Sequence, residues 1–152
     1  MTSGSSDSSV QELVAILLKY QKLEIAASER DDIDSANRYF DRLSAALDQL
    51  ATTSPGRDTL ERLMQHEMPE IRLRAAGRVM AWAPEMAIPV LGRLLVDWKP
   101  RDPRKGYVAV GDGARMRLYQ HFGIRSYNRN DLIEPLRRYG IELPPRSGEI
   151  WT

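Results

Sequence analysis

Arginine and tyrosine side chains are interleaved through the last third of the chain. Of the patterns in this sequence, this one has the clearest chemical use. Residues 99–152 carry eleven Lys/Arg against six Asp/Glu, whereas residues 1–50 carry five against nine. Arginines with interleaved tyrosines bind phosphates and stack on bases, and both residue types also anchor protein interfaces. We therefore predict that this third binds a partner, through Trp98, Tyr107, Tyr119, Arg125, Tyr127 and Arg129.

Tyr127 and Arg129 are the best of these candidates, because they lie in the polar stretch GIRSYNRNDLIEP and helix periodicity assigns neither to a core. Replacing both with alanine is expected to leave folding nearly intact and to cost on the order of 2 kcal/mol or more of binding free energy each. Tyr119 lies at helical spacing and is the candidate that could instead face inward. A second interpretation makes the stretch only a helix–helix connection capped by Asn130.

Other patterns that carry chemistry are weak or missing. His66 and His121 have no partner at metal-ligand spacing, and the chain has no cysteine. The acidic run ERDDID lacks the glycine and final glutamate of a calcium loop, so we interpret it as a helix-capping link and as the next binding candidate. GDG at residues 111–113 lacks the spacing of a phosphate-binding loop, and no nucleophile motif occurs. We expect no enzymatic activity, no metal and no cofactor.

Length and composition favour one globular, soluble domain. The chain has 152 residues, of which 42% are hydrophobic and 28% charged. No apolar run approaches the roughly 18 residues that span a bilayer, and the first residues lack the pattern of a secretory signal. We expect a cytoplasmic protein with no membrane partner. Its predicted parts are a flexible leader at 1–8, a single helical domain at 9–145 and a tail at 146–152.

Apolar residues at helical spacing predict about seven helices and an all-α fold. Ser9 and Glu12 form a capping box that predicts a first helix over 9–28. Asp32 is predicted to cap a second helix. The buried face of that helix is predicted to consist of Ile33, Ala36, Phe40, Leu43, Leu47 and Leu50. SPGRD is expected to end it, and a short third helix is expected over 58–66.

Two prolines, Pro69 and Pro84, each fit the first turn of a central helix. The helix behind Pro69 has one apolar stripe, predicted to be buried, of Ile71, Ala75 and Val79. Arg74 and Arg78 fall on the flank of this stripe and are predicted to remain in contact with solvent. The alanines leave room for a neighbouring helix to approach closely.

The region after residue 97 is predicted to begin with a loop over 98–113, in which YVAV could pair as a short strand. Two further helices are predicted, over 112–122 and 130–139. Gly123 and Gly140 are predicted to end them in the left-handed conformation. Ile141 and Leu143 are expected to anchor the segment that follows.

The stretch HEMPEIRLRAAGRVMAWAPEMAIPVLGRLL resembles a HEAT repeat, with a proline-opened helix, an R-x-x-A run and AIPVL in the second helix. Over about residues 10–98 the order of elements also resembles a small uncharacterised bacterial family of HEAT-like all-α proteins. In that family two longer helices precede one such unit, and a segment like SANRYFDRL lies in the second helix. The resemblance implies a compact stack of helices of the α-α superhelix type.

The functional hypothesis that follows is non-enzymatic protein recognition through a helical surface. Small bacterial proteins that resemble this family fit the role of an immunity or antitoxin-like protein, which binds a toxin domain and covers its active site. A rival hypothesis is a nucleic-acid-binding helical repeat that uses the basic C-terminal third. The net charge of +1 and the isoelectric point of about 8.0 disfavour it. A regulatory adaptor and a homodimer that hides one face are two further hypotheses.

Overall fold

The structure is a computed structural model, which describes residues 3–97 and 110–145. Within these ranges the chain forms α-helices, one 3-10 helix (η2) and no strand, so the predicted all-α fold is confirmed. The elements are α1 (Ser3–Glu29), α2 (Ile33–Leu50), α3 (Ser54–Leu63), α4 (Pro69–Val79), α5 (Pro84–Asp97), α6 (Val110–Phe122), η2 (Arg129–Leu132) and α7 (Ile133–Arg137).

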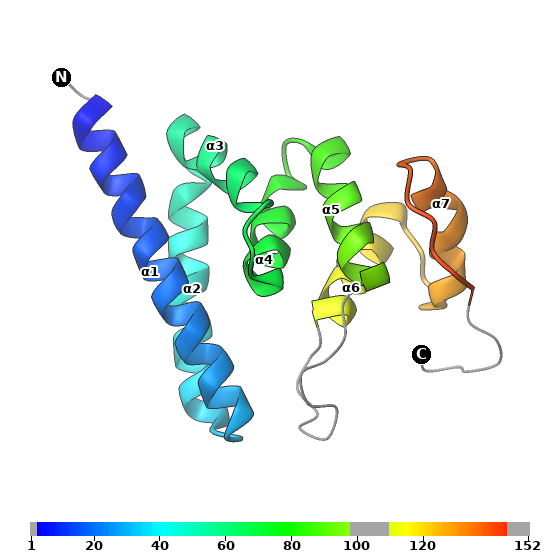
Figure 1. The fold of residues 1–152 in the computed structure, drawn as a ribbon, viewed down its shortest axis with the longest axis horizontal. Coiled ribbons are helices and arrows are strands. Elements are labelled where there is room, and N and C mark those ends of the chain that lie inside the picture. The colour runs from blue at the N-terminus through cyan, green and yellow to red at the C-terminus, as the bar shows by residue number, and fades with distance from the viewer. Residues whose placement is uncertain (1–2, 98–109, 146–152) are drawn as a thin grey trace.

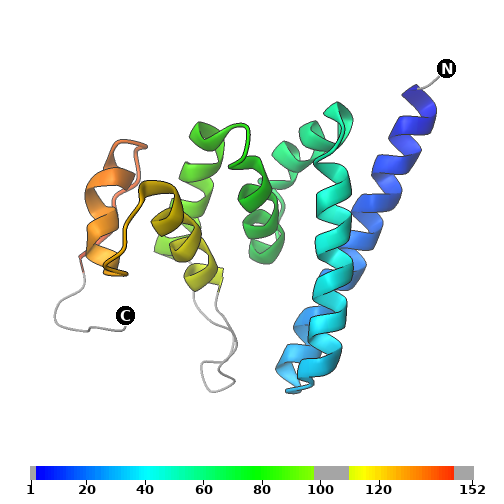
Figure 2. The same cartoon turned by 180° about the vertical axis from the view of Figure 1, so that it is seen from behind.

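The helices follow one another along the long axis of the molecule (Figure 1), with the α1–α2 hairpin at one end and α7 at the other. Contacts between consecutive helices build the stack, and additional contacts join α2 to α4 and α4 to α6. These three helices therefore line one side of the molecule. Figure 2 shows that side, with α2 in front of α1 and α6 in front of α5. No described helix combines the length and the apolar character needed to cross a membrane.

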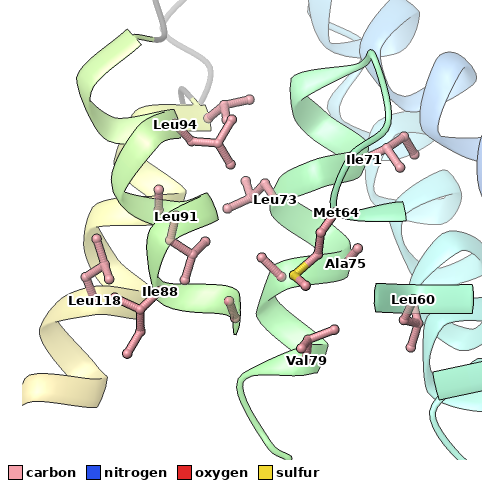
Figure 3. Packing of buried hydrophobic residues seen from close by; sticks show 14 of the residues in the cluster. Leu60, Met64, Ile71, Leu73, Ala75, Val79, Ile88, Leu91, Leu94 and Leu118 are labelled. Atoms are coloured by element: carbon pink, nitrogen blue, oxygen red, sulfur yellow. The ribbon is translucent and has the colours of Figure 1, made fainter. Parts of the chain in front are cut away.

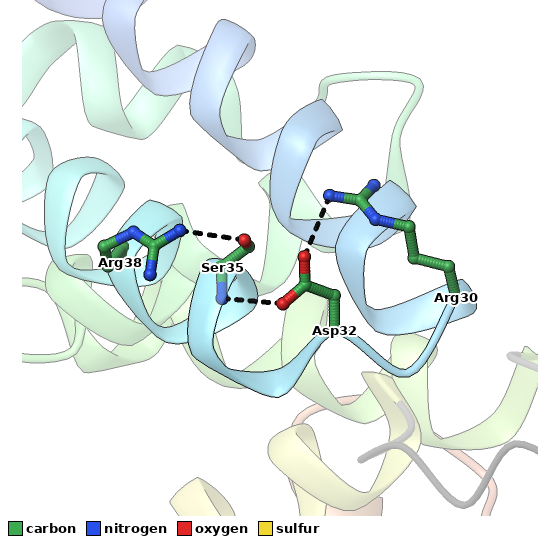
Figure 4. A network of polar contacts seen from close by, with 4 residues as sticks. All are labelled: Arg30, Asp32, Ser35 and Arg38. Atoms are coloured by element: carbon green, nitrogen blue, oxygen red, sulfur yellow. Dashed lines mark hydrogen bonds and ion pairs between the residues drawn. The ribbon is translucent and has the colours of Figure 1, made fainter.

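The turn between α1 and α2 is fixed by the predicted cap at Asp32. Its carboxylate accepts a hydrogen bond from the Ser35 backbone N–H at 3.2 Å and pairs with Arg30 at 3.3 Å. Arg38 in turn donates to the Ser35 hydroxyl at 2.9 Å (Figure 4). The cap satisfies one of the backbone donors that a helix start leaves unpaired, which confirms the boundary that the sequence predicts.

Among the first three helices, two starts differ from the predictions. The first helix begins at Ser3, so the Ser9–Glu12 pair lies inside it and does not mark its start. The third begins at Ser54, where the Thr53 hydroxyl accepts from the Gly56 N–H at 3.1 Å. SPGRD therefore opens a helix instead of ending one, because proline in a first turn loses no helical hydrogen bond.

The core runs through the middle of the stack (Figure 3) and includes the predicted stripe of α4. Ile71, Ala75 and Val79 are all 0% exposed, which confirms the predicted phase of this helix. On α2 the prediction is wrong for two residues, since Ile33 is 69% and Phe40 41% exposed. The end of the α1–α2 hairpin that holds Ile33 extends past the other helices (Figure 1), so no third helix covers it.

In residues 110–145 the observed helix ends agree with the predictions better than the observed helix starts do. Gly123 and Gly140 have φ values of 67° and 80°, which confirms both as left-handed terminators. The predicted last helix is split into η2 and α7, because Pro135 lacks the N–H that a continuous helix would require. The sixth helix begins at Val110, so this residue of YVAV is helical, whereas residues 107–109 lie outside the described ranges. Ile141 and Leu143 are buried as expected.

Candidate functional site

The six residues predicted to bind a partner do not form one exposed site. Trp98 and Tyr107 lie outside the described residues. Tyr119 is 2% exposed and belongs to the core, so it is not an exposed anchor, and burial raises the pKa of its hydroxyl. Tyr127 is exposed and stands edge-on to the Tyr119 ring, with 5.5 Å between the ring centroids. Arg125 is also exposed.

Arg129 is the main correction to the predicted site. The sequence predicts it in a polar loop outside the core, but it is only 7% exposed. Its Nη1 donates to the Pro144 carbonyl at 2.7 Å, which ties η2 to the segment after α7. The premise that Arg129 lies outside the core is therefore wrong, and we now expect its truncation to cost stability. Of the predicted residues that the structure describes, Arg125 and Tyr127 remain accessible to a partner.

A different group of cations gathers on α4 and α6, beside the α1–α2 hairpin. Arg74 and Arg78 come from α4 and Arg117 from α6, and we call these residues the arginine cluster. The sequence predicts that Arg74 and Arg78 are in contact with solvent. Their side chains are 18% and 26% exposed, so they are half-buried and neither is enclosed.

Arg74 and Arg78 each have an acidic partner on the α1–α2 hairpin. Arg74 donates to the Gln21 side chain at 3.1 Å, lies 4.0 Å from Glu24, and has its guanidinium 5.0 Å from the centre of the Phe40 ring. Arg78 pairs with Asp48 at 3.0 Å. These contacts attach α4 to the hairpin and give each of the two cations an acidic neighbour, although burial still lowers the pKa of Arg74.

Arg117 differs from the other two, because no acidic group pairs with it in the part of the chain that the structure describes. Its hydrogen bond there is from Nη1 to the carbonyl of Gly113, one turn earlier in its own helix, at 3.3 Å. Burial lowers the pKa of Arg117, and the positive charges of Arg74 and Arg78 lower it further. A half-buried cation beside like charges has an electrostatic cost that an anion would remove.

The position of Arg117 depends on a glycine of the facing helix. A Cβ atom built on Gly77 would lie 2.4 Å from the Arg117 Nε, so the guanidinium lies directly against the α4 backbone. Gly113 has the same role on α6, where a Cβ would lie 2.8 Å from Leu73. The absence of both side chains lets α4 and α6 approach closely and places Arg117 next to Arg74 and Arg78.

A groove of about 790 Å³ opens elsewhere on the molecule, between the start of α4 and α5. The charged groups along it already have partners, since Arg72 donates to the carbonyls of His66 and Glu67 and Arg93 pairs with Asp97. Its lining is Met64, Gln65, Pro69, Arg72, Pro89, Val90, Arg93, Leu94, Asp97 and Ile141. The groove therefore lacks the unneutralised charge that distinguishes the arginine cluster.

The sequence contained part of the signal for the cluster. The spacing of Arg74 and Arg78 puts both on one helix face, and Gly77 between them marks a place of close approach. Nothing local connects Arg117 to that face, because the contact between α4 and α6 joins residues far apart in sequence. Among the described residues no group of three His, Cys, Asp or Glu side chains could hold a metal ion.

Comparison of the chain with protein-family models, with curated proteins and with solved structures gave no match.

Proposed function

We propose that this chain is a non-enzymatic protein-interaction module, and more specifically an immunity or antitoxin-like protein that binds a toxin domain and blocks it. The observation that carries the general proposal is the half-buried charge of Arg117, which no acid neutralises within the described residues. It lies on the α2–α4–α6 side, where Phe40 is 41% exposed. Arginine and aromatic side chains in such settings are the residues that dominate protein interfaces.

The more specific antitoxin proposal rests on the resemblance of residues 10–98 to small HEAT-like bacterial proteins. A stack of short helices offers a long, rigid side on which a toxin domain can be held, and rigid surfaces lose little conformational entropy on binding. The uneven charge of the chain, acidic in its first third and basic in its last, would steer an oppositely polarised partner and increase the association rate.

The antitoxin proposal is tested with the reading frame adjacent to the gene. Its product is expressed alone, with this chain, and with an unrelated helical protein of similar size as a control. We expect growth arrest from the product alone, relief by this chain only, and a stable complex of the two on a sizing column. An arrest that persists when this chain is present would contradict the proposal.

A nucleic-acid-binding repeat is the second candidate, favoured by the excess of Lys/Arg in residues 99–152. Binding to single- and double-stranded DNA and RNA is measured at two salt concentrations. Phosphate contacts produce a steep loss of affinity with salt, because each one releases condensed counterions. We expect weak binding at both concentrations. Tight binding with a steep salt slope would replace the protein-interaction proposal.

A further inference from the structure

We infer that Arg117 is the receptor for a single carboxylate, carried by an acidic side chain of a protein partner that docks on the α2–α4–α6 side of the molecule. The inference rests on the proposed function only in that the partner is a protein. Beyond the proposed function, it specifies the chemistry of the contact: the partner presents an acidic side chain to Arg117 and carries basic side chains next to that acid.

Arg117 has unused hydrogen-bonding capacity within the described residues. A guanidinium group carries five N–H donors in a planar fork that matches a carboxylate. One nitrogen, Nη1, bonds to the Gly113 carbonyl at 3.3 Å, a long distance for such a bond. The remaining donors have no acceptor among the residues that the structure describes. Because the side chain is half-buried, water compensates this charge less well than it would on an open surface.

Arg117 differs from Arg74 and Arg78 in its acidic neighbours. Glu24 and Asp48 already occupy the acidic contacts of Arg74 and Arg78. An incoming carboxylate therefore meets its strongest attraction at Arg117, with a smaller contribution from the other two cations. Arg117 lies against Gly77 of the facing helix, so its side chain is partly enclosed before an anion binds.

The charge around the arginine cluster favours a protein over a nucleic acid. Asp34, Asp41 and Asp48 recur every seventh residue on α2, so they share one face of that helix, and all three are exposed. Asp48 contacts Arg78, which places the C-terminal end of this acidic stripe beside the arginine cluster. A nucleic-acid backbone, with a charge at every phosphate, would be repelled by the stripe within about one Debye length, roughly 10 Å. One carboxylate flanked by basic side chains fits both the cluster and the stripe.

The inference is tested on the free chain with two short peptides that differ in one residue, a central Glu or Gln flanked by lysines, and with inorganic phosphate. The readout is the Nε–Hε resonance of Arg117 in a nitrogen-15 spectrum, during titration into the millimolar range. We expect a saturable shift with the Glu peptide and at least a tenfold weaker effect with the Gln peptide. Equal effects of the two peptides, or tighter binding of phosphate than of the Glu peptide, would overturn the inference.

Three variants separate the site from the fold. Arg117→Gln removes the charge and should reduce the affinity for the Glu peptide by about tenfold or more. Arg117→Lys keeps the charge and loses only the planar fork, so it should reduce the affinity by a smaller factor. Arg93→Gln, an exposed arginine paired with Asp97 on α5, should leave the affinity unchanged. Circular dichroism checks that each variant is folded. If Arg117→Gln does not fold, the affinity of Arg117→Lys for the Glu peptide is the test, and an unchanged affinity in that variant would overturn the inference.

The outcomes for this inference and for the proposed function are distinguishable. The peptide titration needs no toxin, so relief of growth arrest together with equal binding of the two peptides would retain the antitoxin role and reject the carboxylate site. The reverse pattern would retain the site and reject that role. In the complex with the adjacent gene's product, Arg117→Gln should raise the dissociation constant by about tenfold or more, and an unchanged constant would also overturn the inference.

Discussion

Arg125 and Arg129 show how differently one residue type behaves four positions apart in the same polar stretch. Arg125 is exposed, whereas Arg129 is 7% exposed and donates to the Pro144 carbonyl at 2.7 Å. Both belong to a polar stretch, and composition alone makes both candidates for partner binding. The contact with Pro144 makes Arg129 a structural residue that fixes the chain after α7.

Replacement of Arg129 by alanine is therefore expected to destabilise the protein. The change removes the donor that bonds to the Pro144 carbonyl, and the expected loss in free energy of unfolding is about 1–3 kcal/mol. Arg125→Ala is the matched control, with an expected change within about 0.5 kcal/mol because the side chain is exposed. Urea denaturation followed by circular dichroism measures both. Similar midpoints for the two variants would show that the Pro144 bond contributes nothing.

Asp32 gives a prediction for the dependence of stability on pH. Its hydrogen bonds with Ser35 lower the pKa of the carboxyl below its ordinary value of 3.8. A carboxyl whose pKa is lower in the folded state stabilises the fold above its unfolded pKa and loses that effect as pH falls through the folded pKa. Asp32→Asn keeps a cap but does not titrate. The stability difference between wild type and variant should shrink below pH 3.8, as measured by melting temperatures at several pH values. A difference that stays constant at acid pH would contradict this.

At the scale of elements, glycines decide how closely helices pack, and the two clearest cases differ in what they touch. A Cβ on Gly56 would lie 1.9 Å from the carbonyl oxygen of Leu50, a backbone atom, whereas a Cβ on Gly77 would meet only the Arg117 side chain. Backbone atoms at the end of α2 cannot move without shifting a helix. A long side chain can rotate away.

Replacing each of these glycines with alanine is expected to change the free energy of unfolding by different amounts. Gly56→Ala should destabilise by about 1–3 kcal/mol through overpacking. Gly77→Ala should be much closer to neutral, because displacement of Arg117 is offset by a gain of up to about 1 kcal/mol in helix propensity. Chemical denaturation of both proteins measures the difference. A Gly77 variant as unstable as the Gly56 variant would mean that Arg117 is held rigidly.

At the scale of the whole molecule, the helices form a row in which most contacts join neighbours (Figure 1). Such an arrangement couples its two ends weakly, because each part is stabilised mainly by the elements next to it. The α1–α2 hairpin and α7 lie at opposite ends. Local changes at one end should therefore open that end more easily than the other.

Leu17, which is 0% exposed on α1, provides the test. Leu17→Ala removes buried apolar volume and should cost about 2–5 kcal/mol in the stability of the N-terminal helices. Amide hydrogen exchange should then accelerate in α1 to α3 more than in α6 and α7. Equal acceleration in all helices would show that the stack unfolds as one cooperative unit.

Elements whose signals are local could be predicted from the amino-acid sequence. Asp32 caps a helix, Pro69 opens one, and Gly123 and Gly140 end two, because each acts on backbone groups within a few residues of itself. The stripe of α4 could also be predicted, since helical spacing alone puts Ile71, Ala75 and Val79 on one side.

The tertiary packing decides which side chains of these helices are buried and which charges are compensated. Phe40 matches the apolar period of α2 and is nevertheless 41% exposed, and the guanidinium of Arg74 on α4 lies over its ring. Arg117 has no local feature that marks it, and its importance comes from α6 packing against Gly77 of α4, forty residues earlier in the sequence. Periodicity reports which side of a helix is apolar. Burial and charge compensation depend on which other helix arrives at that side, and distant residues decide that.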